Sequence, residues 1–162
     1  MRLLALALGM LCGWSLFFDG VRIASGTWRL GHDPTRGRFD EFFLRVLSAV
    51  QAQRVDVVGY EHVRRHMGAT AAHVFGGWLA QLDTVHHRTR ARLVGVRTQD
   101  LHAAAGVETA SRREFPNKEA RREENKRRMV AAAHARGWLV KDDNEADACF
   151  VGVAVLSKGA CS

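Results

Sequence analysis

Acidic side chains occur at two places in this sequence where they could hold a divalent metal ion. Glu61 follows an apolar segment, and Asp143, Asn144 and Asp147 stand at the start of a predicted helix. Asn144 and Asp147 are three residues apart, so they lie on one face of that helix. Carboxylate and amide oxygens are ligands that Mg²⁺ and Mn²⁺ prefer in proteins. A pair of such ions can activate water and stabilise the leaving oxygen in phosphodiester hydrolysis.

The same acidic residues also have a purely structural explanation. Negative side chains at positions 142, 143 and 145 favour the N-terminus of a helix through its dipole, and Glu61 alone is typical of a solvated strand end. Histidine does not offer a better metal site. His62, His66 and His73 have no cysteine nearby and lack a second ligand pair, so zinc is not expected.

The hydrophobic pattern predicts the elements that position these residues. Three strands open the chain, at 3–8, 13–18 and 21–30, and Asp19-Gly20 forms the turn between the second and the third. The elements expected next are an amphipathic helix between Phe39 and Val50, a strand at 55–60 that ends at Glu61, a helix at about 70–87 with Thr70 as its N-cap, a strand at 92–96 and a short helix near Thr98.

The C-terminal third is predicted to be helical after a polar connection. Residues 106–125 indicate a loop or mobile segment, with a helix emerging from the later half and continuing over 126–136 until Gly137 ends it. The last helix is expected to begin at 142–144 and to turn Ala146, Phe150, Val153 and Ala154 inward. This order of strands and helices predicts a mixed α/β sheet layered by helices.

Composition restricts the class of protein. The 162 residues, 47% of them hydrophobic, suffice for a single globular domain over 1–162. A net charge of +7 favours an anionic partner, either nucleic acid or a membrane surface. Three distant cysteines give no disulfide framework, so a reducing compartment is expected. No apolar run reaches transmembrane length. Residues 1–12 fit either a buried strand or a signal peptide, and the latter would make this a small secreted basic protein.

Several segments together resemble the RuvC-type Holliday-junction resolvases, in their phage-encoded branch. The segments are LLALALGMLCGWSLF with FDGVRIASGTWRL, then YEHVRRHMGATAAHVFGGWLA, then KRRMVAAAHARGW followed by DDNEADA. The resemblance implies a ribonuclease H-like fold, in which a mixed five-stranded sheet with three antiparallel strands first is flanked by helices. It also implies a homodimer that cleaves branched DNA with Mg²⁺ or Mn²⁺. Residues 3–8 are then a core strand instead of a signal peptide, in a bacterial or phage-infected cytoplasm.

The resemblance assigns roles position by position. Glu61 matches the second carboxylate of the family and Asp147 the last. Asn144 stands where members of the family carry Asp or His, with Asp143 beside it as the alternative ligand. Lys126 matches a basic residue that contacts phosphate near the metal ions.

The resemblance fails at the position of the central catalytic aspartate, which is Ala7 in this sequence. Alanine cannot bind a metal ion, so the chain is expected to be an inactivated structure-selective endonuclease. The alternative is a natural pseudo-nuclease that binds branched DNA without cutting it. Arg64 stands where some cellular members present an aromatic wedge.

Basic residues indicate where DNA would lie. The segment 112–128 holds eight Lys or Arg and four Glu, which fits a DNA-contacting arm or a solvated charged helix. The residues expected to contact DNA are Arg64, Arg65, His66, Lys118, Lys126 and Arg127.

Overall fold

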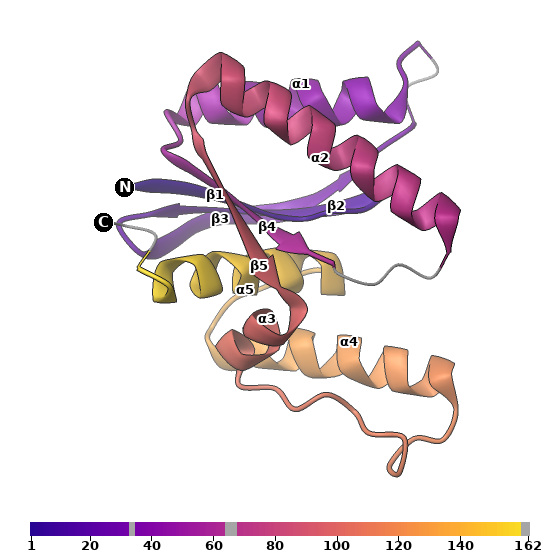
Figure 1. Cartoon of the computed structure of the whole chain (residues 1–162). Coiled ribbons are helices and arrows are strands. Elements are labelled where there is room, and N and C mark those ends of the chain that lie inside the picture. Colours follow the sequence, from indigo (N-terminus) through magenta and orange to yellow (C-terminus); the bar gives the residue numbers. More distant parts are fainter. Residues whose placement is uncertain (33–34, 64–67, 160–162) are drawn as a thin grey trace.

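A five-stranded mixed sheet forms the centre of the molecule, in the strand order β3-β2-β1-β4-β5 (Figure 1). The computed structural model describes residues 1–32, 35–63 and 68–159. The strands are β1 (Arg2–Ala7), β2 (Leu11–Phe18), β3 (Val21–Arg29), β4 (Val57–His62) and β5 (Arg92–Arg97). The first three pair antiparallel, while β1, β4 and β5 run parallel to one another. The predicted mixed sheet with three antiparallel strands first is therefore confirmed.

Helices cover both faces of the sheet (Figure 1). One face carries α1 (Arg38–Gln53) and α2 (Ala69–Thr89), and the other carries α5 (Asp143–Ser157), with α3 (Thr98–Ala105) and α4 (Lys118–Ala135) outside it. The central strand β1 supplies both cores: Leu4 and Leu6 pack on the α1–α2 side, and Leu3 and Ala5 pack on the α5 side. Burial on both faces explains why this segment is apolar without alternation.

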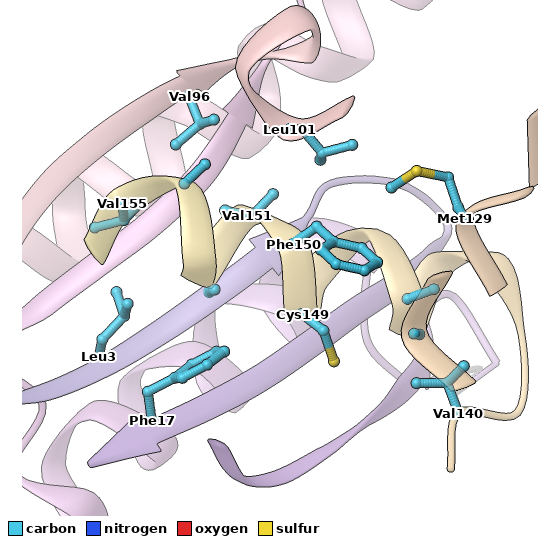
Figure 2. Packing of buried hydrophobic residues seen from close by; sticks show 14 of the residues in the cluster. Leu3, Phe17, Val96, Leu101, Met129, Val140, Cys149, Phe150, Val151 and Val155 are labelled. Atoms are coloured by element: carbon cyan, nitrogen blue, oxygen red, sulfur yellow. The ribbon is translucent and has the colours of Figure 1, made fainter. Parts of the chain in front are cut away.

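Helix α5 is buried on nearly all sides, as Figure 2 shows. The expected inward residues Ala146, Phe150 and Ala154 are buried, and Val153 is half-buried. Cys149, Val151 and Val155 are buried as well, on the side that faces the sheet: Val151 and Val155 lie against Gly59 of β4, and Cys149 lies near Ser25 of β3. Phe150 packs instead against Trp138, on the other side of the helix. The prediction of a single inward stripe was therefore too narrow.

One local prediction was wrong at the start of a helix. Helix α2 begins at Ala69 after Gly68, so Thr70 lies inside the helix and is not its N-cap. The connection before α4 is a loop, which is one of the two possibilities expected for residues 106–125, and hydrogen bonds hold it in place. Asn125 Oδ1 accepts from the backbone N–H of Ala110 (2.7 Å), and Arg121 donates to the carbonyl of Phe115 (2.7 Å).

Helices α4 and α5 each begin at a side-chain cap. Asn117 accepts hydrogen bonds from the N–H groups of Glu119 and Ala120, and Asp142 accepts one from the N–H of Glu145. Such caps satisfy N–H groups that the first turn leaves without a helical partner. In the parts of the chain that the structure describes, no helix is both long and apolar enough to cross a membrane.

Candidate metal and nucleic-acid site

Strand pairing places Ala7 and Glu61 at the same edge of the sheet. Strands β1 and β4 run parallel, with Leu6 opposite Tyr60, so the residues that follow each of these lie side by side. Ala7 is also paired with Gly13 on β2. Position 7 therefore stands between Glu61 on one neighbouring strand and Gly13 on the other.

The start of α5 lies directly against this edge at Gly13. A Cβ atom at position 13 would overlap the backbone carbonyl of Asn144, so only glycine permits this approach of helix to strand. Because Gly13 is the partner of Ala7 in the sheet, the first turn of α5 lies close to position 7. The residues predicted as metal ligands are thus carried by β4 and α5, and both elements meet the end of β1.

Hydrogen bonds to β3 hold the first turn of α5 in place. Thr27 donates to Asp142 Oδ1 (2.8 Å), and Ser25 donates to Glu145 Oε1 (2.6 Å). The other oxygen of Glu145 accepts from the backbone N–H of Lys141 (2.9 Å). Asp142 and Glu145 are therefore used to cap and anchor the helix, which agrees with the structural explanation for these two acids.

Asp147 lies in a crowded acidic environment. Burial and, to a smaller extent, the nearby negative charges of Glu61 and Asp143 together raise the pKa of Asp147 to about 8, although Lys126 acts in the opposite direction. Lys126 lies with its Nζ 3.6 Å from Asp143 Oδ2 and 3.4 Å from Glu123 Oε1. The structure thus brings Glu61, Asp143, Asp147 and Lys126 together at one end of the sheet.

Two residues of α3 also reach this group, and sequence reasoning gave neither of them a role. The Thr98 hydroxyl donates a hydrogen bond of 2.6 Å to Glu61 Oε1. His102 is half-buried, which lowers its pKa, and the charge of Glu61 acts in the opposite direction. Thr98 directly follows β5, which pairs with β4, so the strand pairing brings it to the same edge as Glu61. The sequence does not reveal which strands pair, and this was the information needed to find Thr98.

The donors agree in kind with a hard divalent cation, because carboxylate oxygens are its preferred ligands. Over residues 1–32, 35–63 and 68–159, however, no three His, Cys, Asp or Glu side chains are grouped so that they could hold a metal ion. The methyl group of Ala7 cannot supply the ligand that β1 would contribute. The donor set is therefore suited to Mg²⁺ or Mn²⁺ but lacks one member at position 7.

The predicted DNA-contacting residues are distributed unevenly. Arg64, Arg65 and His66 lie outside the described residues. Lys118 is exposed at the first position of α4, and Arg127 is exposed on the same helix, where its guanidinium pairs with Glu124 (2.7 Å). Lys126 lies next to the acidic residues, with its Nζ 3.6 Å from Asp143 Oδ2.

No protein-family model and no curated protein matches the sequence. Solved structures match by fold. T. thermophilus RuvC in complex with a Holliday junction substrate gives a TM-score of 0.73 at 12% identity, over 100% of this chain and 97% of that chain. Another Thermus thermophilus RuvC structure gives 0.67 at 13% identity, over 99% and 96%. The yeast mitochondrial Holliday junction resolvase Ydc2 gives 0.56 at 11% identity, over 98% and 78%.

The fold is therefore the ribonuclease H-like fold that the sequence predicted, a mixed sheet with helices on both faces. Within that class it is the fold of the RuvC-type Holliday junction resolvases, and the similarity extends over essentially the whole chain. The resemblance noted in the sequence is confirmed at the level of the fold.

Proposed function

We propose that the chain is a RuvC-like protein that binds branched DNA, and that alanine at position 7 leaves it without cleavage activity. The observation that carries this proposal is the convergence of Glu61, Asp143, Asp147 and Lys126 beside Ala7. The net charge of +7 supports an anionic partner. One of the solved structures with the same fold is itself in complex with a Holliday junction substrate.

The residues would have distinct roles in a form with aspartate at position 7. Bound Mg²⁺ or Mn²⁺ ions would supply an activated water and stabilise the leaving oxygen. Glu61, Asp147 and Asp143 or Asn144 would hold the ions together with the new aspartate. Lys126 would offset negative charge on the phosphate. The hydrolysis joins a water oxygen to phosphorus and breaks one phosphorus–oxygen bond of the DNA backbone.

A nicking assay on a labelled four-way junction tests this proposal. We expect the unaltered chain to bind the junction and cut it negligibly in Mg²⁺, and the Ala7→Asp variant to cut it. Adding Glu61→Gln to that variant should abolish cutting, which ties the activity to this site. Strong cutting by the unaltered chain would show that the catalytic carboxylates lie elsewhere.

The alternative proposal is a natural pseudo-nuclease. It differs in one outcome of the same assay: the Ala7→Asp variant would bind the junction but fail to cut it in either Mg²⁺ or Mn²⁺. Asn144 makes Mn²⁺ a useful second metal, because Mn²⁺ accepts amide ligands more readily than Mg²⁺ does. Forked and linear DNA in the same assay would define which branched substrate is preferred.

We also propose a homodimer, because symmetric cutting of a four-way junction needs two sites related by a two-fold axis. We place part of the interface on α2, at those of the residues Phe75, Gly76, Trp78, Leu79 and Leu82 that the core leaves accessible. Phe75, Trp78 and Leu82 are buried within the protomer, so these are Gly76 and Leu79. Sedimentation at micromolar concentration, with and without DNA, tests this proposal, and a monomer under both conditions would contradict it.

A further inference from the structure

One face of α4 packs against the core in the C-terminal half of the helix. In the N-terminal half, the same face carries basic residues. Met129 and Ala133 of this helix are buried in the same core as α5. Steps of three or four residues lead from them back to Arg122 and Lys118, which therefore lie near the same face. In Figure 1 this half of α4 extends past the start of α5, and both residues are exposed.

This basic face leads directly to the candidate site. Lys118, Arg122 and Lys126 are each four residues apart, which separates their Cα atoms by about 6 Å along the helix. Lys126 contacts Asp143 at the start of α5 (3.6 Å). The row of positive charges therefore ends beside the acidic residues. The acids Glu119 and Glu123 lie next to the row, and Glu123 pairs with Lys126 (3.4 Å).

Arg122 differs from the other arginines of α4 in having no partner within the described parts of the chain. Arg121 holds the carbonyl groups of the preceding connection, while Arg127 and Arg128 both bind the carboxylate of Glu124. These three guanidinium groups stabilise α4 and the connection that precedes it. Arg122 is consequently free to contact an external anion.

A hollow continues the row beyond Lys126. It has a volume of about 460 Å³ and lies between α4 and the start of α5, lined by Lys126, Val130, His134 and Asp143 among others. Val130 and His134 extend the same four-residue spacing along α4. The hollow thus offers an apolar wall of Val130 and Ala131 beside Lys126 and Arg127, next to Asp143 at the start of α5.

We propose that one strand of the bound DNA lies along α4, with successive phosphates on Lys118, Arg122 and Lys126, and enters this hollow beside Asp143. The proposal rests on the proposed function and adds a path for the strand and a new contact residue, Arg122. Each lysine or arginine on this path would displace counterions from the DNA, so its removal should lower both the affinity and the salt dependence of binding.

The test measures binding of the unaltered chain to a fluorescent four-way junction by anisotropy, at several NaCl concentrations and without divalent metal. Arg122→Gln should weaken binding several-fold near 100 mM salt and reduce the slope of log affinity against log salt by about 1. Arg122→Lys should restore most of both values, because a phosphate contact requires only the positive charge. Arg92→Gln is the matched control, since Arg92 is exposed at the start of β5, at the opposite edge of the sheet.

The outcomes separate this inference from the proposed function. No junction binding by the unaltered chain would overturn both. Binding that Arg122→Gln and Arg92→Gln weaken equally would overturn the strand path alone, because it would indicate a general effect of net charge. Thermal unfolding of each variant, unchanged within about 2 °C, would show that these surface substitutions leave the fold intact.

Discussion

The hydroxyl of Ser25 on β3 donates a hydrogen bond of 2.6 Å to the buried carboxylate of Glu145 on α5. This contact joins residues 120 positions apart in the chain. The same carboxylate accepts the N–H of Lys141, so it fixes both the start of α5 and the segment before it. Asp143 and Asp147 lie in the first turns of that helix, and their placement therefore depends on a neighbour that has no direct part in the chemistry.

Replacing Glu145 with alanine should destabilise the protein by about 1–3 kcal/mol, because it leaves the half-buried Ser25 hydroxyl without its acceptor and the Lys141 N–H without its partner. Urea unfolding followed by circular dichroism measures the change. Glu119→Ala is the control, since Glu119 is exposed on α4 and surface substitutions usually change stability by less than about 0.5 kcal/mol. Equal losses for the two variants would show that the Ser25–Glu145 contact contributes nothing of its own.

The titration of Asp147 should lower the free energy of unfolding as the pH rises from about 4 to about 8. Its pKa is about 8 in the folded state and 3.8 ordinarily, so over this range the folded state binds more protons than the unfolded state. The stabilisation is complete below the ordinary pKa and is lost as the pH passes the raised one. Asp147→Asn lacks this titration and should gain about 1–3 kcal/mol relative to the parent between pH 5 and pH 9. Urea unfolding at both values tests it, and parallel pH profiles for parent and variant would contradict it.

Thr98 should affect the Mg²⁺ concentration that the Ala7→Asp form needs for nicking, because the Thr98 hydroxyl orients Glu61. Thr98→Val removes the hydrogen bond and should raise the Mg²⁺ concentration for half-maximal nicking about tenfold, as loss of an outer contact to a ligand commonly does. Thr98→Ser keeps the hydroxyl and should stay close to the parent. Calorimetric titration with Mn²⁺ gives a second measurement that does not depend on cutting.

Thr84→Val serves as the control for this change, since the Thr84 hydroxyl donates to the carbonyl of Ala80 within its own helix. If Thr98→Val and Thr84→Val gave the same metal dependence, the hydrogen bond to Glu61 would have no positioning role. If Thr98→Ser were as impaired as Thr98→Val, packing of the side chain would be the cause instead of the hydroxyl.

Lys126 and Arg64 should differ in what they contribute to DNA binding. Lys126→Gln should lower the affinity for branched and linear DNA alike, because a phosphate contact carries no structural selectivity by itself. Arg64→Ala should reduce the preference for branched over linear DNA, since a guanidinium can stack on unpaired bases. Anisotropy titrations with both kinds of DNA measure this, and an equal loss of preference from both variants would reverse the assignment.

The central part of the fold could be predicted from the sequence because it depends on local pattern. An apolar segment at 3–6 without alternation indicates a strand buried on both faces, and β1 is such a strand. The start of α5 was also foreseen, because the acids at 142–145 are typical of a helix N-terminus.

The remaining features depend on contacts between distant segments. The sequence does not show whether Glu145 or Asp143 has a structural role, because both are acids in the first turn of one helix. Glu145 anchors the helix because Ser25 of β3 donates a hydrogen bond to it. The bond between Thr98 and Glu61 likewise requires β5 to pair with β4. The polar composition of the connection before α4 indicates a loop but not its contacts, in which Asn125 and Arg121 bind its backbone and hold it against the helix.

The close approach of Gly13 to the carbonyl of Asn144 has a consequence for the size of ion that the site can accept. Backbone atoms, which cannot change rotamer, set the separation between the end of β1 and the start of α5. A site spanning that gap has little backbone freedom to widen for Ca²⁺, which takes more ligands at longer distances than Mg²⁺ does. We therefore expect the Ala7→Asp form to discriminate between these two ions by radius. Equal affinity for both in a calorimetric titration would contradict this.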